Sequence, residues 1–130
     1  MPLHPGVYAK LLGDKIESNH CKVWLINTGW SGGAYGIGKR MSLPNTRKMI
    51  QAVLNNTIDQ GGYDDFPVFN FKVPKQVPGV DPIILQPENT WSDKSKYIAE
   101  RNNLSHLFQN NFKKFESGVV AAIIDAGPKN

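Results

Sequence analysis

The 130-residue sequence is poor in cysteine and has no long apolar run. Its single cysteine, Cys21, excludes an internal disulfide, and because it stands beside an apolar segment we expect a buried thiol. No segment approaches the roughly 20 apolar residues of a membrane-spanning helix, and residues 1–14 lack the apolar stretch of a secretory signal. These absences predict a reduced, cytoplasmic chain that has no membrane partner.

The sequence also lacks a strong bias of charge and a cluster of metal ligands. Lys and Arg number 15 against 11 Asp and Glu, a net charge of +4, but the cations are scattered and form no basic stripe of the kind that binds nucleic acid. A positive surface that attracts a small anionic ligand explains this charge more simply. His20 and Cys21 are adjacent, yet no two further ligands follow at zinc-site spacing, so we predict no metal site.

Composition and apolar periodicity predict one globular α/β domain. Hydrophobic residues make up 40% of the chain and charged residues 20%, as is typical of globular proteins. The patterns predict, in chain order, a helix from Pro5, a buried strand at 22–26, a helix from Pro44, a half-buried strand at 67–73, an ordered meander at 74–87, a helix from Ser92 to about Glu116, and a short helix at 119–124. His4 is expected to be a helix cap or a surface residue rather than a ligand. The apolar stripe of that helix, which we expect to pack on the sheet, consists of Val7, Tyr8, Leu11, Leu12 and Ile16.

Residues 29–40 form a glycine-rich loop that ends in two cations, Lys39 and Arg40. Glycine permits positive φ angles and a close approach of ligand to backbone, and Pro44 then begins a helix. The loop is therefore a candidate site for an anionic or planar ligand. The pattern G-x-x-x-x-G-K-R at 33–40 is not a P-loop, because Arg40 replaces the Ser or Thr that holds magnesium and the helix begins later.

Two further interpretations of this loop follow from its glycines. Gly36 and Gly38 lack the third glycine of a dinucleotide-binding fingerprint, so we reject that motif. A surface loop in which the glycines only make turns remains the alternative as long as the residues are considered alone.

Several short motifs occur in an order that resembles one enzyme family. The motifs are LHP at 3–5, NTGW at 27–30, GKR at 38–40, TR at 46–47, PVFN at 67–70, VPGV at 77–80 and AGP at 126–128. Together they resemble the C-terminal part of ATP-dependent phosphoenolpyruvate carboxykinase. The GTP-dependent relatives do not carry the run from NTGW to GKR, so the resemblance favours the ATP-dependent class.

The resemblance implies that residues 1–130 are the C-terminal part of an ATP-binding domain, an α/β segment of a mononucleotide-binding domain with a mixed sheet and flanking helices. The family converts oxaloacetate and ATP into phosphoenolpyruvate, carbon dioxide and ADP in gluconeogenesis, with Mn and Mg as metals. Its catalytic residues and metal ligands lie upstream of the part seen here. We therefore expect no catalytic residue in this chain, no activity of the isolated chain, and the remainder of the enzyme as a partner.

By the same resemblance, the family's adenine-binding residues fall on Arg40, Met41 and Thr46. The planar guanidinium of Arg40 can stack on a purine, and backbone groups around Met41 can pair with the adenine edge. Thr46 adds a hydroxyl near the start of the helix. The alternative function is a short non-enzymatic module, derived from that enzyme, that binds nucleotide or another protein.

Overall fold

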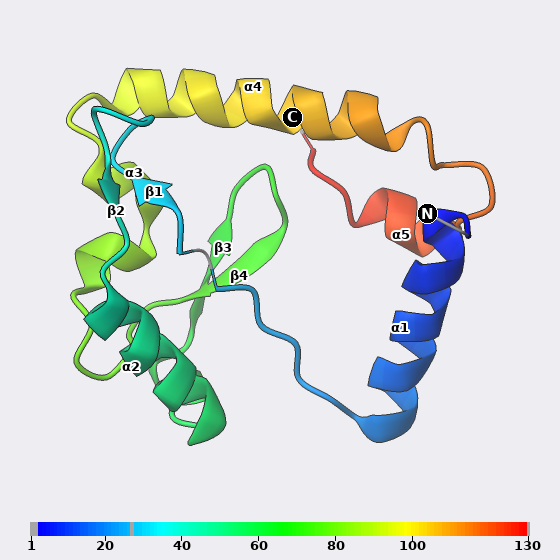
Figure 1. Ribbon diagram of the computed structural model, residues 1–130, viewed down its shortest axis with the longest axis horizontal. Coiled ribbons are helices and arrows are strands. Elements are labelled where there is room, and N and C mark those ends of the chain that lie inside the picture. The colour runs from blue at the N-terminus through cyan, green and yellow to red at the C-terminus, as the bar shows by residue number, and fades with distance from the viewer. Residues whose placement is uncertain (1–2, 27, 130) are drawn as a thin grey trace.

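Two small antiparallel hairpins and a set of helices make up the computed structural model, which describes residues 3–26 and 28–129 (Figure 1). The elements are α1 Pro5–Asn19, β1 Trp30–Ser31, β2 Lys39–Arg40, α2 Leu43–Leu54, η1 Ile58–Gly61, β3 Tyr63–Phe66, β4 Phe71–Pro74, η2 Pro82–Leu85, α3 Pro87–Thr90, α4 Lys94–Phe112 and α5 Ala121–Asp125. The α/β class is confirmed. The mixed sheet is wrong, because the described strands form two separate antiparallel pairs, β1 with β2 and β3 with β4. Asn27, the first residue of the NTGW motif, lies outside the described residues.

The predicted strand at residues 22–26 is also wrong. The described part of this segment pairs with no strand and runs as extended chain between α1 and β1 (Figure 1). Val23 is 60% exposed and Leu25 is 80% exposed, whereas the Trp24 ring stacks on Tyr63 with the centroids 5.9 Å apart. An apolar run shows that side chains need neighbours, but a strand also needs a second strand for its backbone groups. Cys21 is exposed, so the predicted buried thiol is wrong as well.

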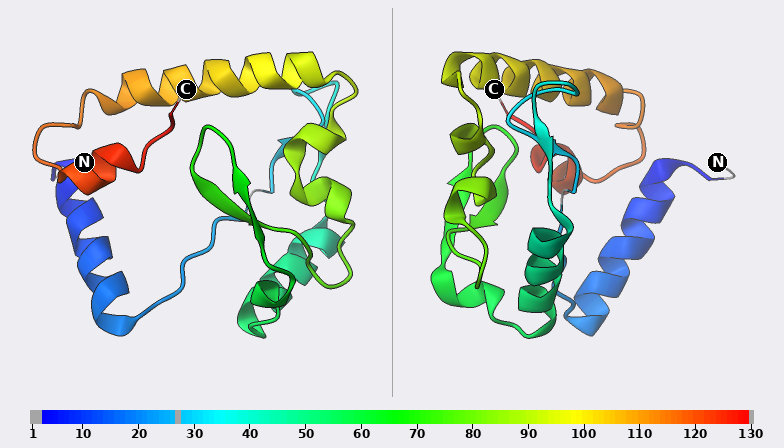
Figure 2. Two further views of the ribbon diagram at one scale, coloured as in Figure 1. Left: turned by 180° about the vertical axis from the view of Figure 1, so that it is seen from behind. Right: turned by 60° about the vertical axis from the view of Figure 1, so that its left-hand side comes forward.

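Helix α1 begins as predicted. His4 is its N-cap, and the His4 Nδ1 accepts a hydrogen bond from the Gly6 N–H at 3.2 Å. The apolar stripe does not pack on a sheet, and α1 stands apart from both hairpins (Figure 2). The members of the stripe that are more than 40% exposed are Val7, Tyr8, Leu11 and Leu12. The prediction failed because an apolar stripe shows that a helix needs a partner surface without showing which surface it is.

Helix α2 carries the small core. The Ser42 Oγ caps this helix by accepting from the Asn45 N–H at 3.3 Å. The buried core residues are Ala52, Ile58, Val77 and Val80. Since Val77 and Val80 belong to the meander at 74–87, that segment is ordered as predicted. The Lys48 Nζ donates to the Gly79 carbonyl at 2.6 Å and ties α2 to the meander.

The turn of hairpin β3–β4 points toward helix α4 (Figure 1). There Phe69 meets Phe108 edge to face, with the ring centroids 6.1 Å apart. The predicted strand at 67–73 is shortened to β4, because residues 67–70 form the turn and Val68 and Asn70 have positive φ angles there. The end of the chain binds the same turn, since the Lys129 N–H donates to the Val68 carbonyl at 2.7 Å. The C-terminal segment therefore fixes the hairpin against α4.

Helix α4 is the longest described helix, and its N-cap is Asp93 rather than the predicted Ser92. The Asp93 carboxylate accepts from the Ser95 N–H at 2.9 Å, and a carboxylate can accept more such bonds than a hydroxyl. The helix ends at Phe112, earlier than predicted. Among the residues that the structure describes, no helix combines the length and the apolar character needed to cross a membrane.

Candidate functional site

The glycine-rich loop folds as the short hairpin β1–β2, in which Ser31 lies opposite Lys39. At Gly38 the chain passes close to the other arm of the loop. A Cβ atom at Gly38 would lie 2.3 Å from the Gly33 carbonyl oxygen and 2.7 Å from the Ser31 carbonyl oxygen. Only glycine fits this space, so Gly38 does more than make a turn.

An open hollow of about 400 Å³ lies beside the hairpin. Its walls come from the hairpin, from the start of α2 and from the segment at 84–90. The residues that matter most for its chemistry are Ser31, Arg40, Met41, Ser42, Ile84 and Thr90. This volume is within the range of small-molecule sites.

Two of the three predicted site residues line the hollow. Arg40, at the end of β2, and Met41, just after it, are both in its wall. The Met41 N–H donates to the Gly29 carbonyl at 2.9 Å, so that N–H is already occupied. Thr46 is not part of the described lining, because it lies one turn into α2 and its hydroxyl donates to the Ser42 carbonyl at 3.1 Å. The binding roles of these three residues stay predictions.

The wall of the hollow that Ile84 and Thr90 form was not predicted from the sequence. The Thr90 Oγ1, from α3, lies 2.8 Å from the Ser31 Oγ. The Thr90 hydroxyl also donates to the Pro87 carbonyl at 2.7 Å. Ile84 of η2 lines the same side. No local pattern points to these residues, since Thr90 is 59 positions from Ser31. In the structure the chain at Gly32 approaches this wall closely, since a Cβ there would lie 2.7 Å from the Thr90 carbonyl oxygen.

The charge of the hollow suits an anionic ligand. Lys39 and Arg40 are exposed cations in its wall, and none of the described lining residues is acidic. The start of α2 adds the partial positive charge of a helix N-terminus. The hollow can therefore accept a planar group beside Arg40 while it attracts negative charge.

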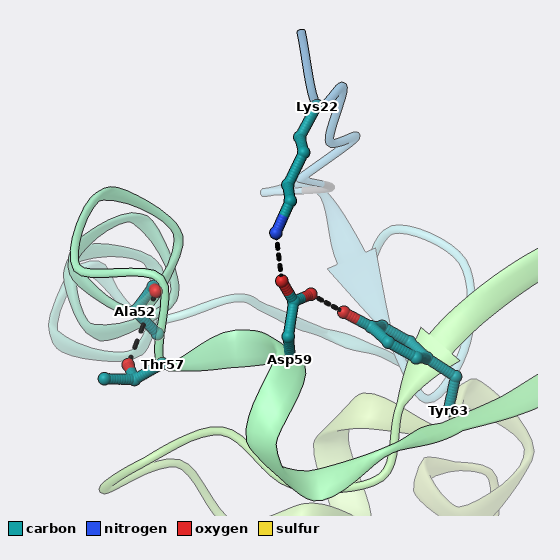
Figure 3. A network of polar contacts seen from close by, with 5 residues as sticks. All are labelled: Lys22, Ala52, Thr57, Asp59 and Tyr63. Carbon is teal, nitrogen blue, oxygen red and sulfur yellow. Dashed lines mark hydrogen bonds and ion pairs between the residues drawn. The ribbon is translucent and has the colours of Figure 1, made fainter. Parts of the chain in front are cut away.

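A polar cluster anchors the segment that leads toward the hairpin (Figure 3). The Asp59 carboxylate accepts from the Lys22 Nζ and from the Tyr63 hydroxyl. The hydrogen bond from Lys22, followed by that from Tyr63, lowers the pKa of Asp59 below its ordinary value. Burial, followed by the bond to Asp59, raises the pKa of Tyr63 to about 12. Through this cluster, Lys22 attaches the segment that precedes β1 to η1 and to β3.

The described residues contain no group of three or more His, Cys, Asp or Glu side chains that could hold a metal ion. Divalent metals such as Mg and Mn prefer oxygen ligands, mainly carboxylates. The donor groups near the hollow therefore do not fit a divalent metal.

Comparison with known proteins gives a consistent result. Residues 1–82 match the family described as Phosphoenolpyruvate carboxykinase. The chain is 53% identical to "Phosphoenolpyruvate carboxykinase (ATP)" of Campylobacter jejuni subsp. jejuni, an alignment that covers 89% of the chain and 22% of that relative. It is 46% identical to the protein of the same name from Thermus thermophilus and 47% identical to that from Fusobacterium nucleatum, over 99% of the chain in both cases. The chain spans about a quarter of the length of these relatives.

Proposed function

The chain belongs to the phosphoenolpyruvate carboxykinase family, and on that premise we propose that it is the C-terminal, adenine-binding part of an ATP-dependent member. Residues 1–130 then form one wall of the ATP pocket within a mononucleotide-binding domain. The observation that carries this proposal is the cationic hollow lined by Arg40 and Met41 at the start of α2.

Each of the three residues that the resemblance assigns to the adenine site has a distinct role in this proposal. The Arg40 guanidinium stacks on the purine face. Since the Met41 N–H is occupied by Gly29, the backbone carbonyls near Arg40 and Met41 are available to accept a hydrogen bond from one of the two N–H groups of the adenine amine. Thr46 supports the start of α2 through its bond to Ser42, and so acts on the hollow through the helix.

The whole protein, in this proposal, is a cytoplasmic enzyme of gluconeogenesis that converts oxaloacetate and ATP into phosphoenolpyruvate, carbon dioxide and ADP. The metals Mn and Mg neutralise phosphate charge in phosphoryl transfer of this kind. As the resemblance implies, this proposal assigns the metals, oxaloacetate and the catalytic groups to the remainder of the enzyme. The isolated chain is then inactive.

The large accessible surface of the chain supports a large protein partner. Its accessible surface is 9534 Å², whereas a folded monomer of its mass exposes about 6,900 Å². The excess, about 2,600 Å², is comparable with what one partner contributes to a large obligate interface. Large apolar side chains are among the exposed residues, including Leu11 and Leu12 in the stripe of α1. We assign the remainder of the enzyme to this surface.

Binding of ATP to the native full-length polypeptide tests the proposal. Replacement of Arg40 by alanine should weaken ATP binding about tenfold, because stacking and charge are both lost. Arg47→Ala is the matched control, since it removes the same charge from an exposed position of α2 outside the described lining. Equal effects of the two variants, measured by calorimetry, would show that only net charge matters and would contradict a specific site.

A further inference from the structure

The hydroxyl groups of Ser31 and Thr90 have a fixed donor order. The Thr90 Oγ1 lies 2.7 Å from the Pro87 carbonyl oxygen. A carbonyl oxygen only accepts hydrogen bonds, and a threonine hydroxyl has a single proton. Thr90 therefore donates that proton to the Pro87 carbonyl. The contact of 2.8 Å between Ser31 and Thr90 must then be donated by Ser31.

This order leaves the Ser31 oxygen with lone pairs only. Its single proton is used toward Thr90, so Ser31 can accept a hydrogen bond from a ligand but cannot donate one. Ser31 lines the hollow beside Arg40 and Met41 and lies opposite Lys39 in the hairpin. An acceptor of fixed polarity therefore stands in the wall where we place the adenine.

The backbone holds the two hydroxyls in register. A Cβ at Gly32 would lie 2.7 Å from the Thr90 carbonyl oxygen, so the chain next to Ser31 approaches α3 as closely as glycine allows. Both Ser31 and Thr90 are partly buried, which limits replacement of their bond by bulk water. The hydrogen-bonded pair is therefore a fixed part of the wall of the hollow.

We propose that Ser31 and Thr90 form a hydroxyl relay that selects a purine carrying an exocyclic amine at position 6. Adenine presents a donor at that position, whereas hypoxanthine and guanine present a carbonyl acceptor. Two acceptors facing one another leave both groups unpaired, and sites built around such bonds reject the wrong partner strongly. The inference rests on the proposed function and names the residues that set its base preference.

The test compares the Kd values of ATP and inosine triphosphate for the native full-length polypeptide and its variants. Inosine triphosphate carries a carbonyl at position 6 and a proton on the adjacent N1, and it lacks the extra amine of guanine, so the change of preference between variants reports on the contact with Ser31. In Thr90→Val the Ser31 proton is released and can turn toward a ligand carbonyl. The preference for ATP should then fall about three- to tenfold, the range expected for one hydrogen bond.

Three further variants make the result specific. Thr90→Ser keeps the hydroxyl and should keep the preference. Thr57→Val is the matched control, because the Thr57 hydroxyl also donates to a backbone carbonyl, that of Ala52 at 3.3 Å, but lies outside the described lining of the hollow. This control should leave the preference unchanged. Ser31→Ala removes the acceptor itself and should lower the preference, because ATP loses a hydrogen bond and inosine triphosphate no longer faces an unpaired acceptor.

An unchanged preference in Thr90→Val, even with both nucleotides bound more weakly, would overturn the relay and leave the pair as a simple structural contact. If Thr90→Val fails to fold, an unchanged preference in Ser31→Ala overturns it equally. Failure of the proposed function looks different, because the native polypeptide would then bind neither nucleotide.

Discussion

Replacement of Gly38 by alanine should disable the hollow, and the structure gives the size of the effect. The added Cβ would lie 2.3 Å and 2.7 Å from two backbone carbonyl oxygens, those of Gly33 and Ser31. Carbon and oxygen lie about 3.3 to 3.6 Å apart even in weak C–H···O contacts, so the loop must open by about 1 Å. Backbone atoms, unlike the tip of a long side chain, cannot turn aside.

Forced overpacking of this kind costs about 1 to 3 kcal/mol. If the open loop cannot bind ATP, that cost appears as a loss of affinity of about 5- to 150-fold. Gly13→Ala is the control, because a Cβ there would have no atom within 4 Å beyond its chain neighbours and the backbone of its own helix, α1. It should leave ATP binding unchanged and stabilise the helix by about 0.5 to 1 kcal/mol. The measurements are ATP calorimetry and thermal unfolding of the full-length polypeptide, and native affinity in Gly38→Ala would refute the reasoning.

Three further outcomes are expected. In the full-length polypeptide, Leu11→Asp should lower the melting temperature because it places a charge on the docked face of α1, whereas Glu17→Lys, on the opposite face of that helix, should have little effect. The raised pKa of Tyr63 contributes stability below about pH 10 that is lost as pH rises toward 12; Tyr63→Phe should flatten this alkaline slope in a pH series of unfolding free energies, and an unchanged slope would contradict it. The isolated chain should produce no phosphoenolpyruvate in a turnover assay with Mn and Mg. Measurable product would contradict the proposal that the catalytic groups lie in the remainder of the enzyme.

Features decided by neighbouring residues could be predicted from the sequence. The cap at His4 and the helix after Pro44 follow from local backbone requirements. The family also follows from short ordered motifs, and the comparisons confirm it. The buried strand at 22–26 failed because it needed a strand partner that the described chain does not supply.

In the hollow, too, the residues set by local sequence could be predicted and those brought in from distant segments could not. Arg40 and Met41 lie next to the glycines that mark the loop, so motif and site coincide in the sequence. Thr90 and Ile84 reach the hollow only because the chain turns back through η2 and α3. Such long-range contacts carry no local periodicity, since they depend on the path of the whole chain.

Ile84 links the hollow to the core, and this leads to a last prediction. It lines the hollow and also packs against the core around Ala52 and Val80. Loss of a fully buried Ile side chain to alanine costs about 2 to 5 kcal/mol; because Ile84 is only partly buried, we expect about 1 to 2 kcal/mol. Ile83→Ala, at the adjacent position that is 54% exposed, should cost less than about 0.5 kcal/mol.

Since one side chain supports both regions, Ile84→Ala should also weaken ATP binding, whereas Ile83→Ala should not. Denaturant unfolding and ATP calorimetry on the full-length polypeptide measure the two effects separately. A loss of stability with native ATP affinity would mean that the core can relax without moving the wall of the hollow, and that the hollow is held by the hairpin and α2 alone.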